Sequence, residues 1–237
     1  MKKSFILLSC VSSLLFSDIN LNDKKNVDKL AIAGLKENIA SIDEKTAGLW
    51  YLRIAQYTKW DKVRNDEFEI QDAITGAYSI FKNNVEKNQE LIGQSSEILL
   101  NVTFQDYDFS KESFQIANLV DKNSYINFYG QTLSSGIKIS FDNVKDEGIF
   151  LTMNKDLAKQ FVQKRKNSWG EINRKLIAKY YFKIRSVSTP NENIVECTYS
   201  KGRANNCYNL GETTVVGHID KIEILDEKGK IFTSVNY

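Results

Sequence analysis

The chain has 237 residues, of which 42% are hydrophobic and 26% are charged, and its formal net charge is +2. This length suffices for one large domain, or for a helical subdomain packed on a second one, with a sizeable core. Of the 32 basic residues, Lys2 and Lys3 lie in the first seventeen positions, which hold no acid, so 30 basic and 30 acidic side chains follow them. This balance excludes any inference about a partner from the global charge.

Residues 1–17 have the pattern of a secretory signal peptide. Two lysines precede an apolar run from Phe5 to Phe16, and Ser17 is a small residue at the expected cleavage site. A bilayer span needs about 20 predominantly apolar residues, and this run is shorter and interrupted by serines. The sequence therefore predicts export to the periplasm or secretion, with no transmembrane span in the mature chain. A lipoprotein-type processing box ends at Cys10, so lipidation of Cys10 is the alternative.

Residues 18–95 are predicted to form a helical segment. Apolar residues recur at the spacing of one helix face, and they fall into three groups. The first group begins at Ile32, the second contains Trp50, and the third runs from Ile70 to Val85. Acidic residues from Asp66 to Asp72 stand where the third helix would begin, and carboxylates favour the positive end of a helix dipole.

Residues 96–237 are predicted to form an antiparallel, β-rich domain. Apolar residues alternate with polar ones from Ile98 to Phe104 and again from Leu176 to Ile184. The segments Ile137–Phe141 and Ile149–Met153 are expected to form a hairpin, because a turn-rich stretch separates them. One helix is expected near 154–166, capped by Asn154. The fold class is therefore α+β: an N-terminal helical segment followed by a mainly antiparallel sheet with one inserted helix.

Cys197 and Cys207 flank a polar stretch rich in turn-forming residues. The pattern predicts a disulfide across a β-hairpin, and closing so short a loop contributes on the order of 2 to 3 kcal/mol. A redox pair or a thiolate metal site is the alternative. Thioredoxin-type pairs are two residues apart, however, and tetrahedral zinc takes about four ligands.

Two fragments resemble patterns found in uncharacterised secreted proteins of Gram-negative bacteria. They are the segment Trp60–Phe68 and the triplet Tyr107-Asp108-Phe109, which Phe114 follows. The resemblance covers about a third of the chain. It implies a domain of unknown function and the same compartment, and it supplies no catalytic residues.

Basic residues concentrate between Lys159 and Arg185, where nine stand against a single acid, Glu171. Together with two aromatic residues, they predict a binding face for an anionic partner. The candidate residues are Lys164, Arg165, Lys166, Trp169, Arg174, Lys175, Lys179, Tyr181, Lys183 and Arg185.

The same basic residues also have structural explanations, which remain as alternatives to a binding face. Cations complement the dipole at the end of a helix, and lysines protect sheet edges from aggregation. Acidic segments such as Asp66–Asp72 would neutralise the basic face if they folded over it. Because export is expected, an envelope protein or an anionic envelope component, such as lipid head groups or surface polysaccharide, is a more suitable partner than nucleic acid.

Enzymatic chemistry has few candidate residues. His218 is the single histidine, and Asp220 would share its strand face, but no Gly-x-Ser-x-Gly nucleophile motif accompanies them. The carboxylate pairs Asp106 with Asp108 and Asp146 with Glu147 are ordinary for turns and strand ends. Calcium binding by Asp142, Asn143, Asp146 and Glu147 would lack the EF-hand spacing and glycine. No glycine-rich phosphate loop is present, so no nucleotide cofactor is expected. With no metal-binding pattern either, we expect no cofactor and no metal.

These observations predict an exported interaction or accessory protein of the cell envelope, which binds an anionic partner through a basic strand face. The alternative is a secreted hydrolase that uses carboxylates. The sequence indicates nothing about the oligomeric state.

Overall fold

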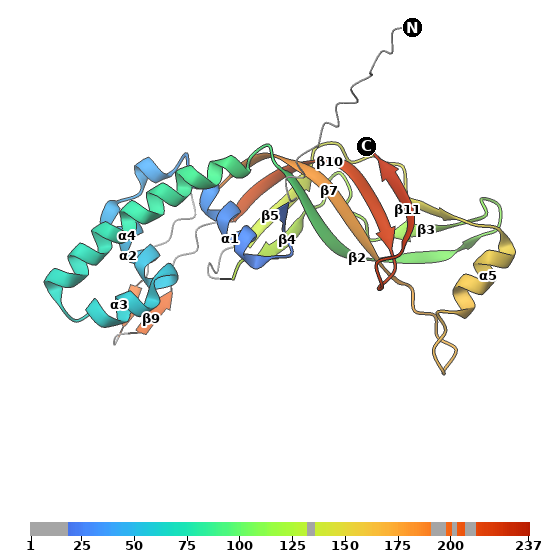
Figure 1. The fold of residues 1–237 in the computed structure, drawn as a ribbon, viewed down its shortest axis with the longest axis horizontal. Coiled ribbons are helices and arrows are strands. Elements are labelled where there is room, and N and C mark those ends of the chain that lie inside the picture. Colours follow the sequence, from blue (N-terminus) through green and yellow to red (C-terminus); the bar gives the residue numbers. More distant parts are fainter. Residues whose placement is uncertain (1–18, 132–135, 191–197, 201–202, 207–211) are drawn as a thin grey trace, which may run out of the picture.

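The computed structural model describes residues 19–131, 136–190, 198–200, 203–206 and 212–237. In this part of the chain, five α-helices accompany a nine-stranded mixed sheet, so the fold is α+β, as predicted. The molecule is elongated, with α2, α3 and α4 at one end and α5 at the other (Figure 1). The sheet lies between these two helical ends.

Five α-helices and two short 3₁₀ helices are described. Their bounds are α1 Lys24–Ala33, η1 Ile39–Ser41, α2 Glu44–Ala55, α3 Tyr57–Val63, α4 Glu67–Lys87, η2 Asn88–Leu91 and α5 Lys155–Gln163. The acidic cluster does mark a helix start: the Asp66 carboxylate caps α4 by accepting hydrogen bonds from the N–H groups of Phe68 and Glu69. Asn154 caps α5 in the predicted way, through the N–H of Leu157.

Helices α2 and α4 pack closely along one another. Their buried contact contains the rings of Trp50, Tyr51 and Phe81, with the centroids of Trp50 and Phe81 5.5 Å apart. Gly48 permits the close approach, since a Cβ atom at this position would lie only 2.3 Å from the backbone oxygen of Ile74. The aromatic stripes seen in the sequence are therefore the core of a helical layer.

The strands form one large sheet and one small pair. The large sheet contains β1 Ile19–Asn20, β2 Ser95–Asp108, β3 Ser113–Ala117, β4 Ile126–Tyr129, β5 Gly136–Phe141, β6 Phe150–Thr152, β7 Lys175–Ser188, β10 Thr213–Leu225 and β11 Ile231–Asn236. Its order is β4-β5-β10-β7-β2-β3-β6, with β1 paired to β2 and β11 paired to β10. The separate pair is β8 Thr198–Ser200 with β9 Arg203–Asn206.

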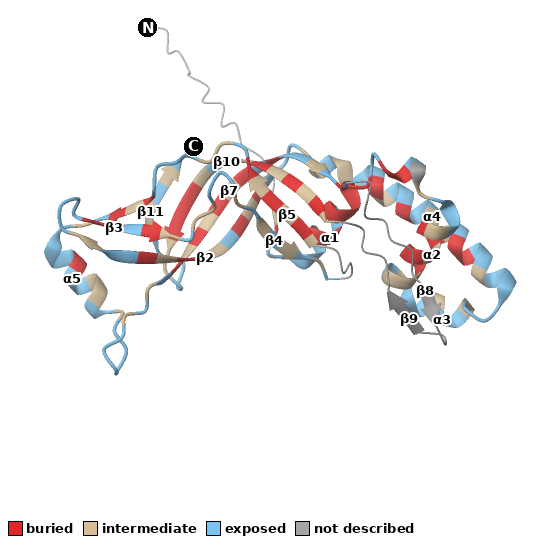
Figure 2. Cartoon of the chain, turned by 180° about the vertical axis from the view of Figure 1, so that it is seen from behind, coloured by how far each residue is buried: buried red, intermediate tan, exposed pale blue. Residues whose placement is uncertain are grey.

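Three long strands, β2, β7 and β10, run through the centre of the sheet and bury one face. On β7 the buried side chains run from Leu176 through Tyr180 to Ile184, and the side chains between them are half-buried or exposed (Figure 2). The alternation in the sequence thus gives the correct faces of this strand. The opposite, open face of β7 carries Lys175, Lys179, Tyr181 and Lys183.

Helix α5 covers one end of the buried face through a single aromatic side chain. The ring of Phe161 lies 5.1 Å from Phe104 of β2, 5.5 Å from Phe114 of β3 and 5.4 Å from Phe232 of β11, measured between centroids. Because these strands lie on both sides of the central ones, Phe161 fixes α5 across the end of the sheet. Apart from the buried Ala158 and the half-buried Phe161 and Val162, the side chains of α5 are exposed.

Two expectations about strand pairing are corrected. The sheet is mixed, because β5 pairs in parallel with β10 and β1 pairs in parallel with β2. The expected hairpin between Ile137–Phe141 and Ile149–Met153 is wrong: β5 pairs with β4 and β10, whereas β6 pairs with β3. Alternation defines which side of a strand is buried but carries no information about its neighbour.

The remaining expectations concern the cysteine pair and the N-terminal segment. Strands β8 and β9 pair antiparallel within the polar stretch between the cysteines, where the sequence predicts a hairpin. Cys197 and Cys207 themselves, residues 1–17 and Cys10 lie outside the described residues.

Candidate functional site

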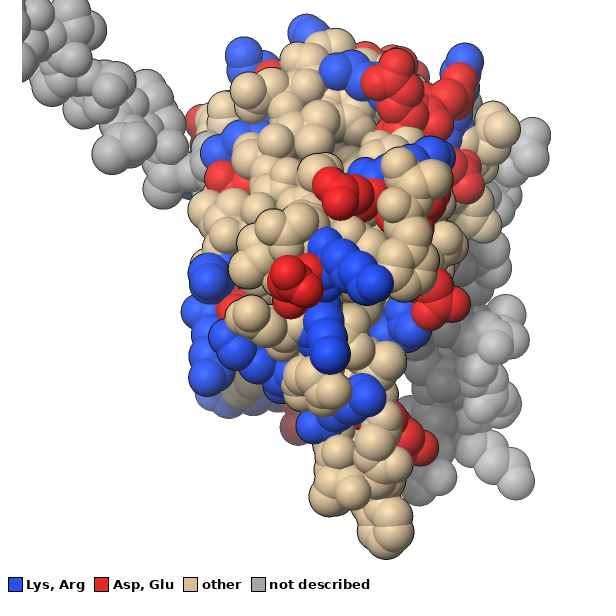
Figure 3. Space-filling model, turned by 90° about the vertical axis from the view of Figure 1, so that its right-hand side faces the viewer, with Lys and Arg blue, Asp and Glu red and all other residues tan. Residues whose placement is uncertain are grey.

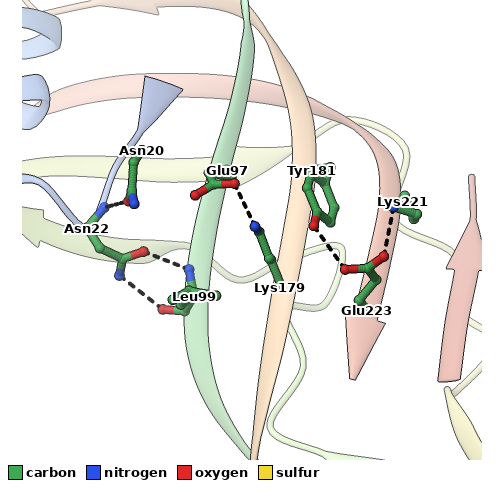
Figure 4. Close-up of polar contacts among 8 residues, drawn as sticks. All are labelled: Asn20, Asn22, Glu97, Leu99, Lys179, Tyr181, Lys221 and Glu223. Atoms are coloured by element: carbon green, nitrogen blue, oxygen red, sulfur yellow. Dashed lines mark hydrogen bonds and ion pairs between the residues drawn. The ribbon is translucent and has the colours of Figure 1, made fainter. Parts of the chain in front are cut away.

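The centre of the basic strand face is an internal polar network (Figure 4). The Lys179 Nζ lies 2.7 Å from Glu97 Oε2 on β2. On the other side, the Tyr181 hydroxyl donates to Glu223 Oε2 over 2.9 Å, and Lys221 Nζ donates to Glu223 Oε1 over 2.8 Å. Two lysines and two glutamates thus neutralise one another across three strands.

The aromatic ring of this network also binds its cations. The ammonium groups of Lys179 and Lys221 lie 4.7 Å and 4.3 Å from the Tyr181 ring centroid, within cation–π range. Burial raises the pKa of Glu223, but hydrogen bonds from Lys221 and Tyr181 outweigh burial, so its pKa is below the ordinary value. Lys179 and Tyr181 therefore make their polar contacts within the sheet, and the acids that they contact, Glu97 and Glu223, come from neighbouring strands.

The other predicted residues of β7, with Arg174 immediately before it, divide into two groups. Arg174 pairs with the Asp106 carboxylate and donates to the backbone oxygen of Phe104, so it too holds strands together. The ammonium or guanidinium groups of Lys175, Lys183 and Arg185 are exposed and lie in no ion pair with a described residue. Lys183 and Arg185 remain a small basic surface toward the far end of the strand.

A groove of about 770 Å³ lies between α5 and the turn that joins β10 to β11. Its apolar lining consists of Met153, Leu157, Phe161 and Phe232. Basic side chains from both walls stand around this lining: Lys164, Arg165 and Lys166 after α5, and Lys228 and Lys230 from the turn. We call this feature the α5 groove. Lys and Arg side chains gather on the α5 end of the molecule (Figure 3).

Arg165 shapes the groove from inside. Its guanidinium carbon lies 4.8 Å from the Phe161 ring centroid and 5.7 Å from that of Phe232. One guanidinium nitrogen, Nη1, also donates to the backbone oxygen of Lys175 over 3.0 Å. Because a planar guanidinium can stack and donate at once, Arg165 ties the end of α5 to the start of β7 and covers the aromatic rings.

The acids of the α5 groove are already engaged. Asp226 Oδ1 accepts hydrogen bonds from the backbone N–H groups of Lys228 and Lys230, at 2.8 Å and 2.9 Å. The bond from Lys230 is the main reason that the pKa of Asp226 lies below its usual value. Glu227 accepts a hydrogen bond from the Asn173 side chain. With five cations and two acids, the groove has a net charge of +3.

Four lysines of the α5 groove are available to a ligand. No ion pair joins them to any carboxylate in the described part of the chain, and all four are exposed: Lys164, Lys166, Lys228 and Lys230. A groove with an apolar lining and unneutralised ammonium groups at its rim fits a ligand that has both anionic and apolar parts.

Trp169 stands next to this groove, on the loop between α5 and β7. Lys166 and Ile172 form an isolated antiparallel bridge at the base of the loop. The Trp169 side chain is 87% exposed, more than any other large hydrophobic side chain in the described residues. The loop therefore presents an indole to the surroundings two residues after Asn167, which lines the groove.

The residues considered for catalysis make structural contacts. His218 Nδ1 lies 2.7 Å from Asp142 Oδ1, so the carboxylate at the histidine belongs to Asp142 and not to Asp220. The Asn143 side chain exchanges two hydrogen bonds with the backbone of Ile219. The Asp108 carboxylate accepts from Ser110 in a tight turn, which lowers its pKa.

The oxygen ligands considered for calcium do not gather around one point. Asp142 and Asn143 make the contacts with His218 and Ile219 described above, and Asp146 and Glu147 are exposed. Within the described ranges, no group of three or more His, Cys, Asp or Glu side chains is arranged to hold a metal ion.

The sequence did not single out the second wall of the α5 groove. Lys228 and Lys230 belong to a turn that the sequence shows as Asp226-Glu227-Lys228-Gly229. The end of α5, which faces this turn across the groove, lies about 60 positions earlier in the chain. Their proximity to α5 follows from the contact of Phe161 with Phe232.

Comparison with known families matches residues 44–164 to the family described as "Domain of unknown function (DUF4852)". The chain belongs to this family. The predicted resemblance to a family without an assigned function is thus confirmed, and the fragments at Trp60–Phe68 and Tyr107–Phe109 lie inside the match. No curated protein and no solved structure matches the chain significantly.

The DUF4852 match ends within the site. It contains α2 to α5 and β2 to β6, but neither β7 nor β10, which are the central strands of the sheet. One wall of the α5 groove, at Lys164, lies at the end of the match, and the other wall lies beyond it. Among the described helices, none is both long and apolar enough to cross a membrane.

Proposed function

We propose that this protein is an exported, non-catalytic interaction or accessory protein of the cell envelope, which binds an anionic partner through the α5 groove. One observation carries the proposal: four lysines at the rim have no carboxylate partner in the described residues, while both acids of the groove already accept hydrogen bonds, Asp226 from its own turn and Glu227 from Asn173. The proposed contact thus lies on the groove, and the centre of the strand face has a structural role.

Unneutralised cations around a concave surface raise the local concentration of an anionic ligand. The apolar lining adds contact area that a purely polar ligand would not use. Export rests on the pattern of residues 1–17, and it makes an envelope component a more suitable partner than nucleic acid. No observation in the described residues favours the alternative of a carboxylate-dependent hydrolase, since its candidate carboxylates have structural partners or are exposed.

The test compares two charge reversals of equal size. In the groove variant, Lys164→Glu and Lys166→Glu are combined; in the strand variant, Lys183→Glu and Arg185→Glu are combined. All four side chains are exposed and lie outside the ion pairs of the described residues. The probe is immobilised dextran sulfate, and the salt concentration needed to elute the purified protein is measured.

We expect the groove variant to elute at much lower salt than the wild type, and the strand variant to elute close to the wild type. Loss of retention in the strand variant alone would move the binding site to β7. Equal retention of the wild type and both variants would contradict an anion-binding function of either surface.

A further inference from the structure

The loop that follows α5 is rigid and has its own hydrogen bonds. Asn167 Oδ1 accepts from the backbone N–H groups of Trp169 and Glu171, both at 2.9 Å. The backbone of Asn167 also bonds to Glu171 and Gly170, and Gly170 has a φ of +81°, which favours glycine. The loop keeps its shape without any contribution from the Trp169 side chain.

This loop projects from the body of the molecule between α5 and β7 (Figure 1). The Trp169 indole at its tip is 87% exposed. No ring contact or cation–π contact of Trp169 with another described residue is present. Because the backbone of this turn is already ordered, it loses little further backbone entropy when the indole enters a less polar environment. The indole is thus positioned for contact with a partner.

The cations lie on both sides of this loop. Lys164 and Lys166 precede it and Lys175 follows it, while Lys228 and Lys230 face it across the α5 groove. The one acid of the loop, Glu171, accepts a hydrogen bond from Asn167 Nδ2. Exposed apolar side chains accompany them, namely Leu157 at 53% and Ile231 at 50% exposure. Charge and apolar surface are thus combined at one end of the molecule.

Resting on the proposed function, we propose that the anionic partner is the head-group layer of an anionic phospholipid bilayer, into which the Asn167–Gly170 loop inserts the Trp169 indole. Tryptophan favours the boundary between head groups and acyl chains because its ring is largely apolar and its N–H is polar. Lysines beside such a surface are attracted by anionic head groups within a Debye length. A soluble polyanion would satisfy the lysines but would leave the indole in water.

The shape of the site favours a bilayer over a folded protein. A Trp anchor in a protein complex fills a pocket of its partner and is surrounded by close packing. Here the indole stands on a narrow projection, and the nearest groove has long, exposed lysine side chains at its rim. A fluid interface adapts to such a surface. Attachment of this kind needs no membrane-spanning helix.

The first experiment is co-sedimentation of the full chain with phosphatidylcholine vesicles, with or without phosphatidylglycerol. We expect binding to the vesicles that contain phosphatidylglycerol, and loss of this binding at high salt. Trp169→Ala and the groove variant should each weaken vesicle binding by about tenfold or more. The strand variant is the matched control and should bind like the wild type.

The second experiment locates the indole by fluorescence quenching with brominated phospholipids. Trp50 is 3% exposed and lies with Trp60 in the helical end, so both supply a constant background. Quenching of the wild type and its absence in Trp169→Phe support insertion of Trp169. Phenylalanine keeps an apolar ring at the tip of the loop, so we expect this variant still to bind the vesicles. A loss of quenching in this variant then reports the missing indole and not a loss of binding.

The outcomes separate the two proposals. Retention on dextran sulfate through the groove lysines, without binding to phosphatidylglycerol vesicles or without quenching of Trp169, overturns the lipid inference and leaves the proposed function standing. Failure to bind both dextran sulfate and anionic vesicles overturns both proposals.

Discussion

The Lys179 ammonium on β7 forms an ion pair with the Glu97 carboxylate on β2, with 2.7 Å between Nζ and Oε2. The two residues are diagonal neighbours, since Leu99 stands directly opposite Lys179 and Glu97 stands opposite Tyr181. Both side chains are about one-fifth exposed, at 23% and 20%. The pair therefore belongs to the sheet as a structural contact.

We expect Lys179→Glu to destabilise the fold by about 1–3 kcal/mol, because it places two carboxylates in contact on a partly buried face. The exchanged pair, Lys179→Glu with Glu97→Lys, should recover most of this loss. Urea denaturation measures both free energies of unfolding. Lys183→Glu, on the same face but outside the network, is the control and should change stability by less than about 0.5 kcal/mol. A double variant as unstable as the single one would disprove the pairing.

Glu223 should make the stability of the sheet depend on acid pH. Its folded pKa is below the ordinary value of 4.5, so its charge stabilises the fold fully above that pH and progressively less as the pH falls through the folded pKa. Glu223→Gln removes the titrating group. On acidification from neutral pH, the variant should therefore lose less stability than the wild type.

Denaturation midpoints at a series of pH values test this sign, with Glu147→Gln as the control at an exposed carboxylate. Parallel pH curves for the wild type and Glu223→Gln would show that the charge of Glu223 contributes nothing to stability.

Two glycines in the helical layer should respond oppositely to alanine. At Gly48 the added Cβ would meet the Ile74 backbone oxygen at 2.3 Å, so Gly48→Ala should separate α2 from α4 and cost about 1–3 kcal/mol. At Gly76 the nearest atom is Lys59 Nζ at 3.9 Å, so Gly76→Ala should stabilise α4 by up to about 1 kcal/mol. Thermal unfolding of both variants distinguishes these signs, and a neutral Gly48→Ala would contradict the close helix approach.

Processing of the N-terminus tests the expected export. Mass spectrometry of the protein recovered from the periplasm should find Asp18 as the first residue, with residues 1–17 removed. Cys10→Ser should leave the location unchanged. A lipid-modified N-terminus at Cys10, abolished by that substitution, would establish the lipoprotein alternative in its place.

Local patterns in the sequence predicted several of the elements, but neither all of them nor their pairing. Asp66 and Asn154 marked helix starts because their side chains satisfy backbone donors nearby in the chain. The alternation along β7 gave its buried face. The parallel pairing of β5 with β10 depends on a contact between distant segments, and neither strand's own pattern specifies the other.

The candidate site was predictable in part for the same reason. The basic residues between Lys164 and Arg185 are visible as a composition anomaly, but their structural roles depend on neighbours. Glu97 and Glu223 neutralise Lys179 from adjacent strands, and Lys228 and Lys230 join Lys164 across the groove. The charge pattern of the sequence therefore identified the basic region. Only the fold distinguishes the cations that pair with carboxylates from those that have no carboxylate partner in the described residues.

The most direct test of an anion-binding α5 groove is a map of backbone amide chemical shifts during titration with a short-chain phosphatidylglycerol below its micelle concentration. We predict changes that concentrate at Lys164–Gly170 and at the turn from Asp226 to Lys230. Changes centred on Lys183 and Arg185 of β7, or no changes at all while the lipid remains soluble, would contradict the assignment of this groove as the binding site.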